Sequence, residues 1–152
     1  MKKTDLIWLA GFFDGEGCIS IVTAIEKQKK RHVLRYRLIV ELSQAKEEGK
    51  RICEWCAINF KGTIHEIPKK EIYHLSKWRW IIRCTQARDF LKQIYPYLKI
   101  KKKRAKLAFE MQKELSKNKY KTHPSEIEKI EKYSYYEVIK QEMGFLNVKG
   151  RK

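Results

Sequence analysis

Two carboxylates separated by a glycine are the residues of this sequence best suited to chemistry. Asp14 and Glu16 lie in the segment Asp14-Gly15-Glu16-Gly17, directly after an apolar run with the composition of a helix. The C-terminal end of a helix carries unsatisfied carbonyls and the negative end of the helix dipole. Hard divalent cations prefer carboxylate and carbonyl oxygens, and a metal held there can assist phosphodiester hydrolysis. The alternative is that both acids only solvate the turn that ends the helix.

The charge of the chain favours a polyanionic partner. Its 152 residues include 35 Lys and Arg against 18 Asp and Glu, a formal net charge of +17. Nucleic acid is therefore the leading candidate and a membrane surface the weaker one. No apolar stretch approaches the ~20 residues of a spanning helix and no signal segment opens the chain. We expect no membrane partner, an intracellular location and one domain over residues 1–152.

The apolar run before the acids has a face that suits close helix packing. Ile7, Ala10, Gly11 and Asp14 lie at i, i+3, i+4 and i+7, so they share one side of a helix. Two of the four have almost no side chain, which allows an approach closer than the usual distance of about 8 to 10 Å between helix axes. The expected partner is the same helix in a second copy of the chain, around a two-fold axis that brings both acidic segments together.

Hydrophobic periodicity predicts the elements that position these residues. Helices are expected over about 5–13, 46–58, 86–98 and 100–115, and strands over about 18–25, 33–44, 62–67 and 72–84. One or two further helices are expected in the lysine-rich tail. The residues expected to face the core from the two clearest strands are Leu34, Tyr36, Leu38, Val40, Leu42, Trp78, Trp80, Ile82 and Cys84. The order predicts an α+β fold whose antiparallel sheet is covered by helices on one side only.

The uncovered side of that sheet is expected to be basic and to contact DNA. A two-stranded ribbon fits the major groove, and a strand of about nine residues spans about nine base pairs, so a dimer covers about twenty. Glu41 can accept from cytosine or orient a neighbouring arginine, and for His65 an ordinary surface position is an equal alternative. The residues expected on this face are Ser20, Glu26, Arg35, Arg37, Glu41, Thr63, His65, Lys77, Arg79 and Arg83.

Aromatic residues in the strands offer a different hypothesis, a stacking platform for single-stranded nucleic acid. The candidates are Tyr36, Tyr73, Trp78 and Trp80. Because Trp78 and Trp80 alternate with Lys77 and Arg79, a basic outer face places both tryptophans in the core instead.

The cysteines could in principle hold a metal. Cys53 and Cys56 form a C-x2-C pair, but it lies in a helical segment and no second half-site follows. We expect these two, and also Cys18 and Cys84, to be reduced thiols, with buried small apolar positions favoured over a zinc site.

The nonapeptide LAGFFDGEG at residues 9–17 resembles the signature of the LAGLIDADG homing endonucleases, and the αββαββα order that follows matches the core of that family through about residue 115. The resemblance implies that Glu16 is a metal ligand, that Gly15 offers its carbonyl, and that Asp14 is structural at the dimer interface. The implied metal is Mg2+, and Mn2+ or Ca2+ can occupy the same site. The family often has Asp where this chain has Glu16.

The resemblance also assigns roles to three polar positions outside the motif. Gln44 resembles a residue that organises active-site water, and Lys101 resembles the basic residue that approaches the scissile phosphate. A second basic residue is expected near the next helix, where Lys50 and Arg51 are both candidates. Without the resemblance, Lys101 is a solvated lysine in a basic run and Gln44 an ordinary strand-end residue.

With one motif, the chain resembles the homodimeric branch, in which two copies build one active site. This implies a nuclease that originates in a mobile intron or intein, with intron encoding favoured, and that cuts both strands of a long pseudo-palindromic site, leaving short 3′ overhangs. The core would span about 4–115 and a basic helical extension about 116–152. The alternatives are a non-cleaving protein on the same fold, such as an RNA maturase or a DNA-binding regulator, and a structural RNA-binding protein supported by charge alone.

Overall fold

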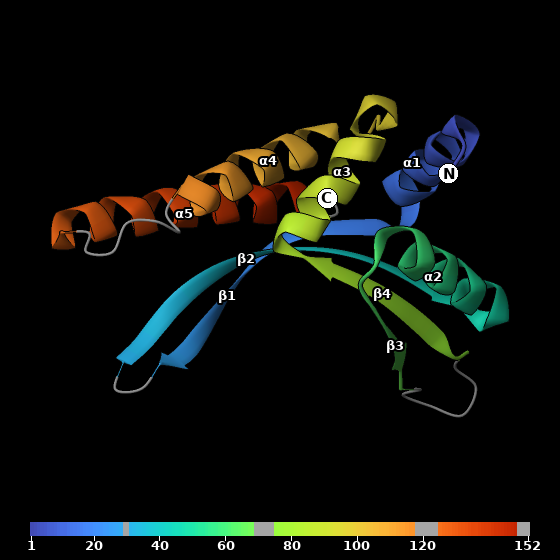
Figure 1. Cartoon of the computed structure of the whole chain (residues 1–152), viewed down its shortest axis with the longest axis horizontal. Coiled ribbons are helices and arrows are strands. Elements are labelled where there is room, and N and C mark those ends of the chain that lie inside the picture. Colours follow the sequence, from blue (N-terminus) through green and yellow to red (C-terminus); the bar gives the residue numbers. More distant parts are fainter. Residues whose placement is uncertain (29–30, 69–74, 118–124, 149–152) are drawn as a thin grey trace.

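The computed structural model describes residues 1–28, 31–68, 75–117 and 125–148. The elements follow the expected order, and the described part of the tail contains one of the one or two helices expected there (Figure 1). They are α1 (Lys3–Glu16), β1 (Gly17–Gln28), β2 (Arg31–Ala45), α2 (Lys46–Phe60), β3 (Thr63–Ile67), β4 (Lys77–Arg83), α3 (Cys84–Ile94), the short 3-10 helix η1 (Tyr95–Tyr97), α4 (Lys102–Lys117) and α5 (Glu126–Asn147). The α+β prediction, with an αββαββα core, is confirmed.

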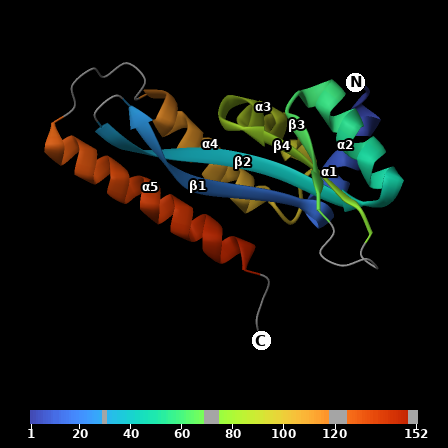
Figure 2. The same cartoon turned by 90° about the horizontal axis from the view of Figure 1, so that it is seen from below.

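The four strands form one antiparallel sheet in the order β1-β2-β4-β3. Leu42 in the middle of the sheet is paired with Gly17 on one side and with Trp80 on the other, and Trp80 is paired with Ile64. All the helices lie on one face, and the strands arch away beneath them like a saddle (Figure 1). From below, the other face of the sheet is open and α5 runs along the β1 edge (Figure 2).

The core lies between the sheet and the helices, and the alternation of residues along the strands creates it. Tyr36, Leu38, Val40, Leu42, Trp80 and Ile82 are all buried, as expected. Leu34 lies on the same face of β2 but is not in the core: it is exposed, and so is its partner Ile25. Toward its tip the β1–β2 hairpin bends away from the helices above it (Figure 1). The prediction that Cys84 belongs to the strand is wrong, since β4 ends at Arg83 and Cys84 begins α3.

The first helix is longer than expected. It continues through Gly15 and ends at Glu16, so the two glycines do not stop it at residue 13. Gly17 instead begins β1 without a loop, and a Cβ there would lie 2.1 Å from the Phe13 ring. Glycine is therefore required for the direct step from helix to strand, which fixes where Glu16 points relative to the sheet.

The C-terminal extension contains a single long helix in its described part. α5 begins with a capping box, in which the Glu128 amide donates to Ser125 Oγ (3.2 Å) and the Ser125 amide donates to the Glu128 carboxylate (3.0 Å). Near its other end, Asn147 Nδ2 donates to the Ile19 carbonyl in β1 (2.8 Å). Among the described residues, no helix has both the length and the apolar character needed to cross a membrane.

Candidate functional site

Asp14 connects the end of α1 to the loop that precedes α4. Its carboxylate accepts hydrogen bonds from three consecutive backbone amides, those of Lys99 (2.6 Å), Ile100 (3.1 Å) and Lys101 (2.9 Å). Hydrogen bonds to an ionised carboxylate are stronger than neutral ones. The carboxylate is buried, so it fixes the position of this loop on the last turn of α1.

Lys101 is brought to the same place by its side chain. Its ammonium group donates to the backbone carbonyl of Asp14, and the residue is buried. Burial lowers the pKa of Lys101, and the cation of Arg104 lowers it further, while the charges of Asp14 and Glu16 act in the opposite direction. The ammonium group therefore lies against the last turn of α1, close enough to Glu16 for the two charges to interact.

Glu16 and Gly15 are exposed at the end of α1. A Cβ added to Gly15 would have nothing within 4 Å, so this end of the helix is open to approach. The last carbonyls of a helix have no partner within it. Among the described residues, no group of three or more His, Cys, Asp and Glu side chains could hold a metal. The exposed carboxylate of Glu16 and the carbonyls at the helix end are oxygen donors of the kind that a divalent cation prefers.

Gln44 and Lys50 share Trp78 of β4 as a neighbour. Because Gly17 is paired with Leu42, the register of β1 and β2 places Gln44 level with the last turn of α1. Gln44 is also paired with Trp78, and Lys50 Nζ lies 4.9 Å from the centre of the Trp78 ring. Of the two basic candidates on α2, Lys50 therefore lies over the ring of the residue paired with Gln44, whereas Arg51 is exposed.

The four residues expected to form one free face of α1 do not all lie on it. Ala10 is fully buried and Asp14 is 7% exposed, because both face the interior of their own chain. The expectation is corrected for these two residues. Ile7 is 47% exposed, and Gly11 has open space above its Cα.

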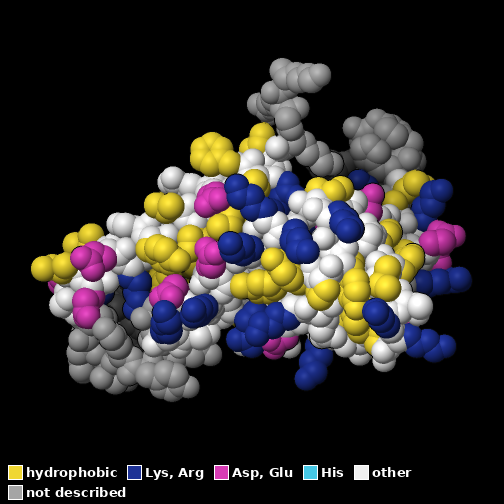
Figure 3. Space-filling model, turned by 90° about the horizontal axis from the view of Figure 1, so that it is seen from above, with side chains coloured by type: hydrophobic (Ala, Val, Ile, Leu, Met, Phe, Trp, Pro, Cys, Tyr) yellow, Lys and Arg dark blue, Asp and Glu magenta, His cyan; other side chains and the backbone are white. Residues whose placement is uncertain are grey.

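Trp8 joins Ile7 and Gly11 on the exposed surface of α1. It is 50% exposed, stacks on Phe12 with ring centres 5.3 Å apart, and touches Trp55 of α2 edge-on. Viewed from the helix side, hydrophobic side chains gather over the end of the molecule where α1 lies (Figure 3). The free face of α1 is thus built from Ile7, Trp8 and Gly11.

The ten residues nominated as DNA contacts all lie on strands of the sheet. The pairs Ser20–Ile39, Ile39–Arg83 and Ser43–Arg79 show that these positions share a face with one another, opposite the buried residues. Glu26 forms ion pairs with Arg35 and Arg37, and Glu41 forms one with Arg79. The uncovered face therefore carries arginines whose positions are set by two glutamates.

Arg104 and Cys18 are neighbours of Lys101 that the sequence did not single out. Arg104 donates to the Leu146 carbonyl at the end of α5. Burial is the main cause that raises the pKa of Cys18, and Glu41 raises it further, while Lys101 and Arg104 lower it. Arg104 lies in a run of basic residues, where no pattern in the sequence distinguishes it from the others.

The aromatic residues do not form a stacking platform on the open face. Trp80 and Tyr36 are buried on the helix side, and Trp80 Nε1 donates to the Lys61 carbonyl (2.7 Å). Trp78 is half-buried beneath Lys50, and Tyr73 lies outside the described residues. The preference for core positions over stacking is therefore confirmed for Trp80 and Tyr36.

The four cysteines are free thiols. Cys53 and Cys56 are both buried in α2, as expected, and burial raises the pKa of Cys56 to about 12. The C-x2-C pair therefore belongs to the core between α2 and the sheet.

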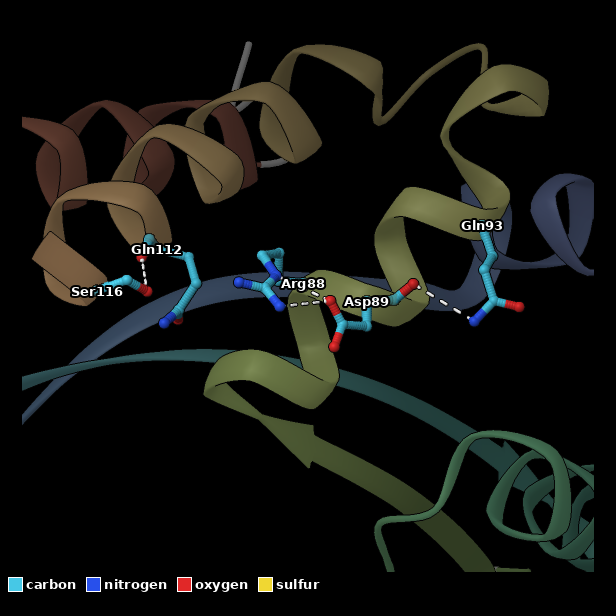
Figure 4. A network of polar contacts seen from close by, with 5 residues as sticks. All are labelled: Arg88, Asp89, Gln93, Gln112 and Ser116. Carbon is cyan, nitrogen blue, oxygen red and sulfur yellow. Dashed lines mark hydrogen bonds and ion pairs between the residues drawn. The ribbon is translucent and has the colours of Figure 1, made fainter.

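A second polar cluster lies between α3 and α4 (Figure 4). Its hydrogen bonds remain within each helix: Arg88 Nε donates to Asp89 (2.8 Å), and Ser116 Oγ donates to the Gln112 carbonyl (2.8 Å). These contacts have no connection to the end of α1, so the cluster is separate from the site formed by Glu16 and Lys101.

Comparison of the chain with known protein families and solved structures identifies its family. A family model described as LAGLIDADG endonuclease matches residues 9–106. The chain belongs to the LAGLIDADG endonuclease family. The match covers the α1 acids, Gln44 and Lys101, and it ends before the extension that contains α5. No curated protein matches the chain.

Solved structures of LAGLIDADG homing endonucleases have the same fold. I-CvuI, in complex with its target in the presence of calcium, is 19% identical with a TM-score of 0.69, over 99% of this chain and 86% of that chain. The archaeal intron-encoded I-Vdi141I, complexed with DNA, is 14% identical with a TM-score of 0.73, over 100% and 89%. I-SmaMI, bound to cleaved DNA, is 15% identical with a TM-score of 0.68, over 95% of this chain but only 45% of that chain.

Proposed function

We propose that this LAGLIDADG family member is a homodimeric, site-specific DNA endonuclease that depends on a divalent metal. The observation that carries the proposal is the contact of Asp14 with the loop before α4. It brings the Lys101 ammonium and the Glu16 carboxylate to the same end of α1. In metal-assisted phosphodiester hydrolysis, an anionic side chain holds the metal and a nearby cation can stabilise the phosphate. This open helix end offers both groups.

The residues around this helix end have separate roles in the proposed reaction. Glu16 and the Gly15 carbonyl would hold Mg2+, which when bound supplies a Lewis acid and an activated water. Lys101, as a cation, stabilises the charge that develops on the scissile phosphate. Gln44 orients the attacking water, and Lys50, over the ring of the Trp78 that is paired with Gln44, is the second basic group.

A second copy of the chain completes the proposed site. One chain offers a single carboxylate at the end of α1, whereas hard cations take six or more oxygen ligands. The exposed face of α1, with Ile7, Trp8 and Gly11, ends at that carboxylate. Packing this face against its twin brings two Glu16 side chains to the two-fold axis. I-SmaMI, of which this chain covers only 45%, is long enough to supply both halves in one chain.

The open face of the sheet is the proposed DNA-binding surface. Two subunits would cover about twenty base pairs of a pseudo-palindromic site, and both strands would be cut to leave short 3′ overhangs. I-CvuI and I-Vdi141I were both solved with DNA, and I-Vdi141I is intron-encoded. Encoding by a mobile intron is accordingly part of the proposal for this chain.

Metal-dependent cleavage of a selected DNA site is the direct test. The wild-type protein is used to select duplexes from a randomised library supplemented with candidate intron-insertion loci, with Mg2+ and then with EDTA. Glu16→Gln is expected to bind the selected site as wild type does but to cut it at least about a hundredfold more slowly. Glu131→Gln, an exposed change on α5, is the matched control and should cut normally.

The same assay separates the competing functions. A wild-type protein that binds one site tightly but never nicks it with Mg2+ would be a non-cleaving binder, such as a maturase or a regulator. If Glu16→Gln changes neither binding nor cleavage, the result would support a protein that binds RNA by charge alone.

A further inference from the structure

Two glutamates lie on the open, otherwise basic face of the sheet, and each is paired with arginines. Glu26 lies 3.6 Å from Arg35 Nε and also contacts the Arg37 guanidinium. Glu41 lies 3.8 Å from Arg79 Nε. Because the surface is expected to bind a polyanion, the presence of these acids calls for a physical reason.

The two glutamates have the same geometry. The residue paired with Glu26 is Val33, so Arg35 lies two residues further along β2 on the same face. The residue paired with Glu41 is Ile81, and Arg79 lies two residues away along β4. In each case the contact runs diagonally across neighbouring strands, where long side chains can reach one another. Each glutamate therefore holds a guanidinium near itself on the open face of the sheet.

These ion pairs contribute little to folding. The side chains of Glu26, Arg35 and Arg37 are 35%, 50% and 39% exposed, and those of Glu41 and Arg79 are 31% and 40% exposed. Ion pairs with this exposure are worth little to stability. The effect of the glutamates should therefore appear in what the surface binds.

Arg79 shows how a glutamate can orient an arginine without using its donors. Arg79 Nε is buried and has no hydrogen-bond partner in the described part of the chain. Its distance of 3.8 Å from Glu41 is too long for a hydrogen bond. The attraction to Glu41 is therefore electrostatic, and the guanidinium remains able to donate two hydrogen bonds to guanine O6 and N7.

We propose that Glu26 and Glu41 are specificity-determining residues, which hold Arg35, Arg37 and Arg79 toward base edges and oppose binding to phosphates alone. On unrelated DNA the arginines turn to the phosphates, which leaves each glutamate unpaired next to a polyanion. On the correct site an arginine can contact a base and keep its glutamate. This inference rests on the proposed function, because it requires that the open face binds duplex DNA.

The experiment compares the E26Q/E41Q double variant with E66Q. Glu66 is an exposed glutamate of the same sheet, but its pairing with Trp78 places it on the helix side, and no ion pair to it occurs within the described ranges. The dissociation constants of the selected site and of an unrelated duplex are measured over a series of salt concentrations. The double variant should bind the unrelated duplex about three- to tenfold more tightly per glutamate removed, with a salt slope steeper by about 0.9 for each.

The affinity for the selected site should rise less, so the ratio of specific to non-specific binding falls, while E66Q leaves the ratio unchanged. Weaker binding of the selected site with unrelated DNA unaffected would mean that the glutamates contact bases directly, and it would overturn the inference. A ratio equal to that of wild type would overturn it as well. A wild-type protein that prefers one site but never cuts it would defeat the proposed nuclease and leave this inference standing.

Discussion

Asp14 shows how one residue of a functional motif can act through position rather than contact with a substrate. Three amides separated from it by 85 to 87 residues in sequence converge on its carboxylate. The same carboxylate is buried, so an orphaned donor or acceptor there is costly. Asp14 therefore fixes the position of Lys101, and Glu16, two residues later, is left exposed as the proposed metal ligand.

Asp14→Asn tests this role. An amide presents only one acceptor oxygen to the three amides and carries no charge, so the free energy of unfolding should fall by about 2 to 3 kcal/mol. Urea denaturation measures the loss, and DNA cleavage should fall further than binding as Lys101 loses its position. Asp5→Asn is the control, because Asp5 accepts from the Lys2 amide (2.9 Å) at an exposed helix start. The loss of stability in this variant should be below about 1 kcal/mol. Equal losses would contradict the positioning role.

α5 is attached to the sheet by the buried phenol of Tyr36. Tyr36 of β2 donates to the Glu137 carboxylate of α5 (3.0 Å) and packs against Tyr136, with ring centres 5.3 Å apart. Burial raises the pKa of Tyr36 to about 12, and the hydrogen bond to Glu137 acts in the same direction. Hydrogen bonds from Lys140 and then from Tyr36 lower the pKa of Glu137. The contact thus requires a neutral phenol and an ionised carboxylate.

This contact predicts a pH dependence at the alkaline end. Because the folded-state pKa of Tyr36 lies above its ordinary value of 10, its contribution is complete below pH 10 and is lost as the pH rises toward about 12. Tyr36→Phe should lower the free energy of unfolding by about 1 to 2 kcal/mol at pH 8. The gap between variant and wild type should close above pH 10 in urea denaturation. A gap of constant size would show that the phenol does not titrate as described.

The strands and α1 also show which buried residues could be predicted from the sequence and which could not. Alternation predicted which strand residues are buried, because β2 and β4 have helices on one face only. It failed at Leu34, where the hairpin bends away from the helices (Figure 1), since periodicity does not record how the sheet curves. Spacing alone placed Ala10 and Asp14 with Ile7 and Gly11, although their own chain buries them. The contacts of Asp14 with residues 99–101 could not be foreseen, because no pattern in the sequence marks such a distant pair.

The proposed active site exists only where two chains meet. The free face of α1 has the two properties that such a contact needs. It exposes apolar surface at Ile7 and Trp8, and it has no side chain at Gly11. Because the face ends at Glu16, the proposed dimer contact and the proposed metal site share one location, and a change at Gly11 should affect cleavage without touching a catalytic group.

Gly11→Leu separates the dimer from the fold of the single chain. A Cβ at Gly11 meets nothing within 4 Å, and leucine favours a helix by about 1 kcal/mol over glycine, so the monomer should be at least as stable. Sedimentation should nevertheless show loss of the dimer at micromolar concentration, and cleavage of the selected site should fall at least about a hundredfold, because the bulky side chain keeps the two α1 helices apart. Gly144→Leu makes the same change in open space on α5 and should leave assembly and cleavage intact. A fully active dimeric Gly11→Leu protein would place the contact between subunits elsewhere and would separate Glu16 from any two-fold axis at α1.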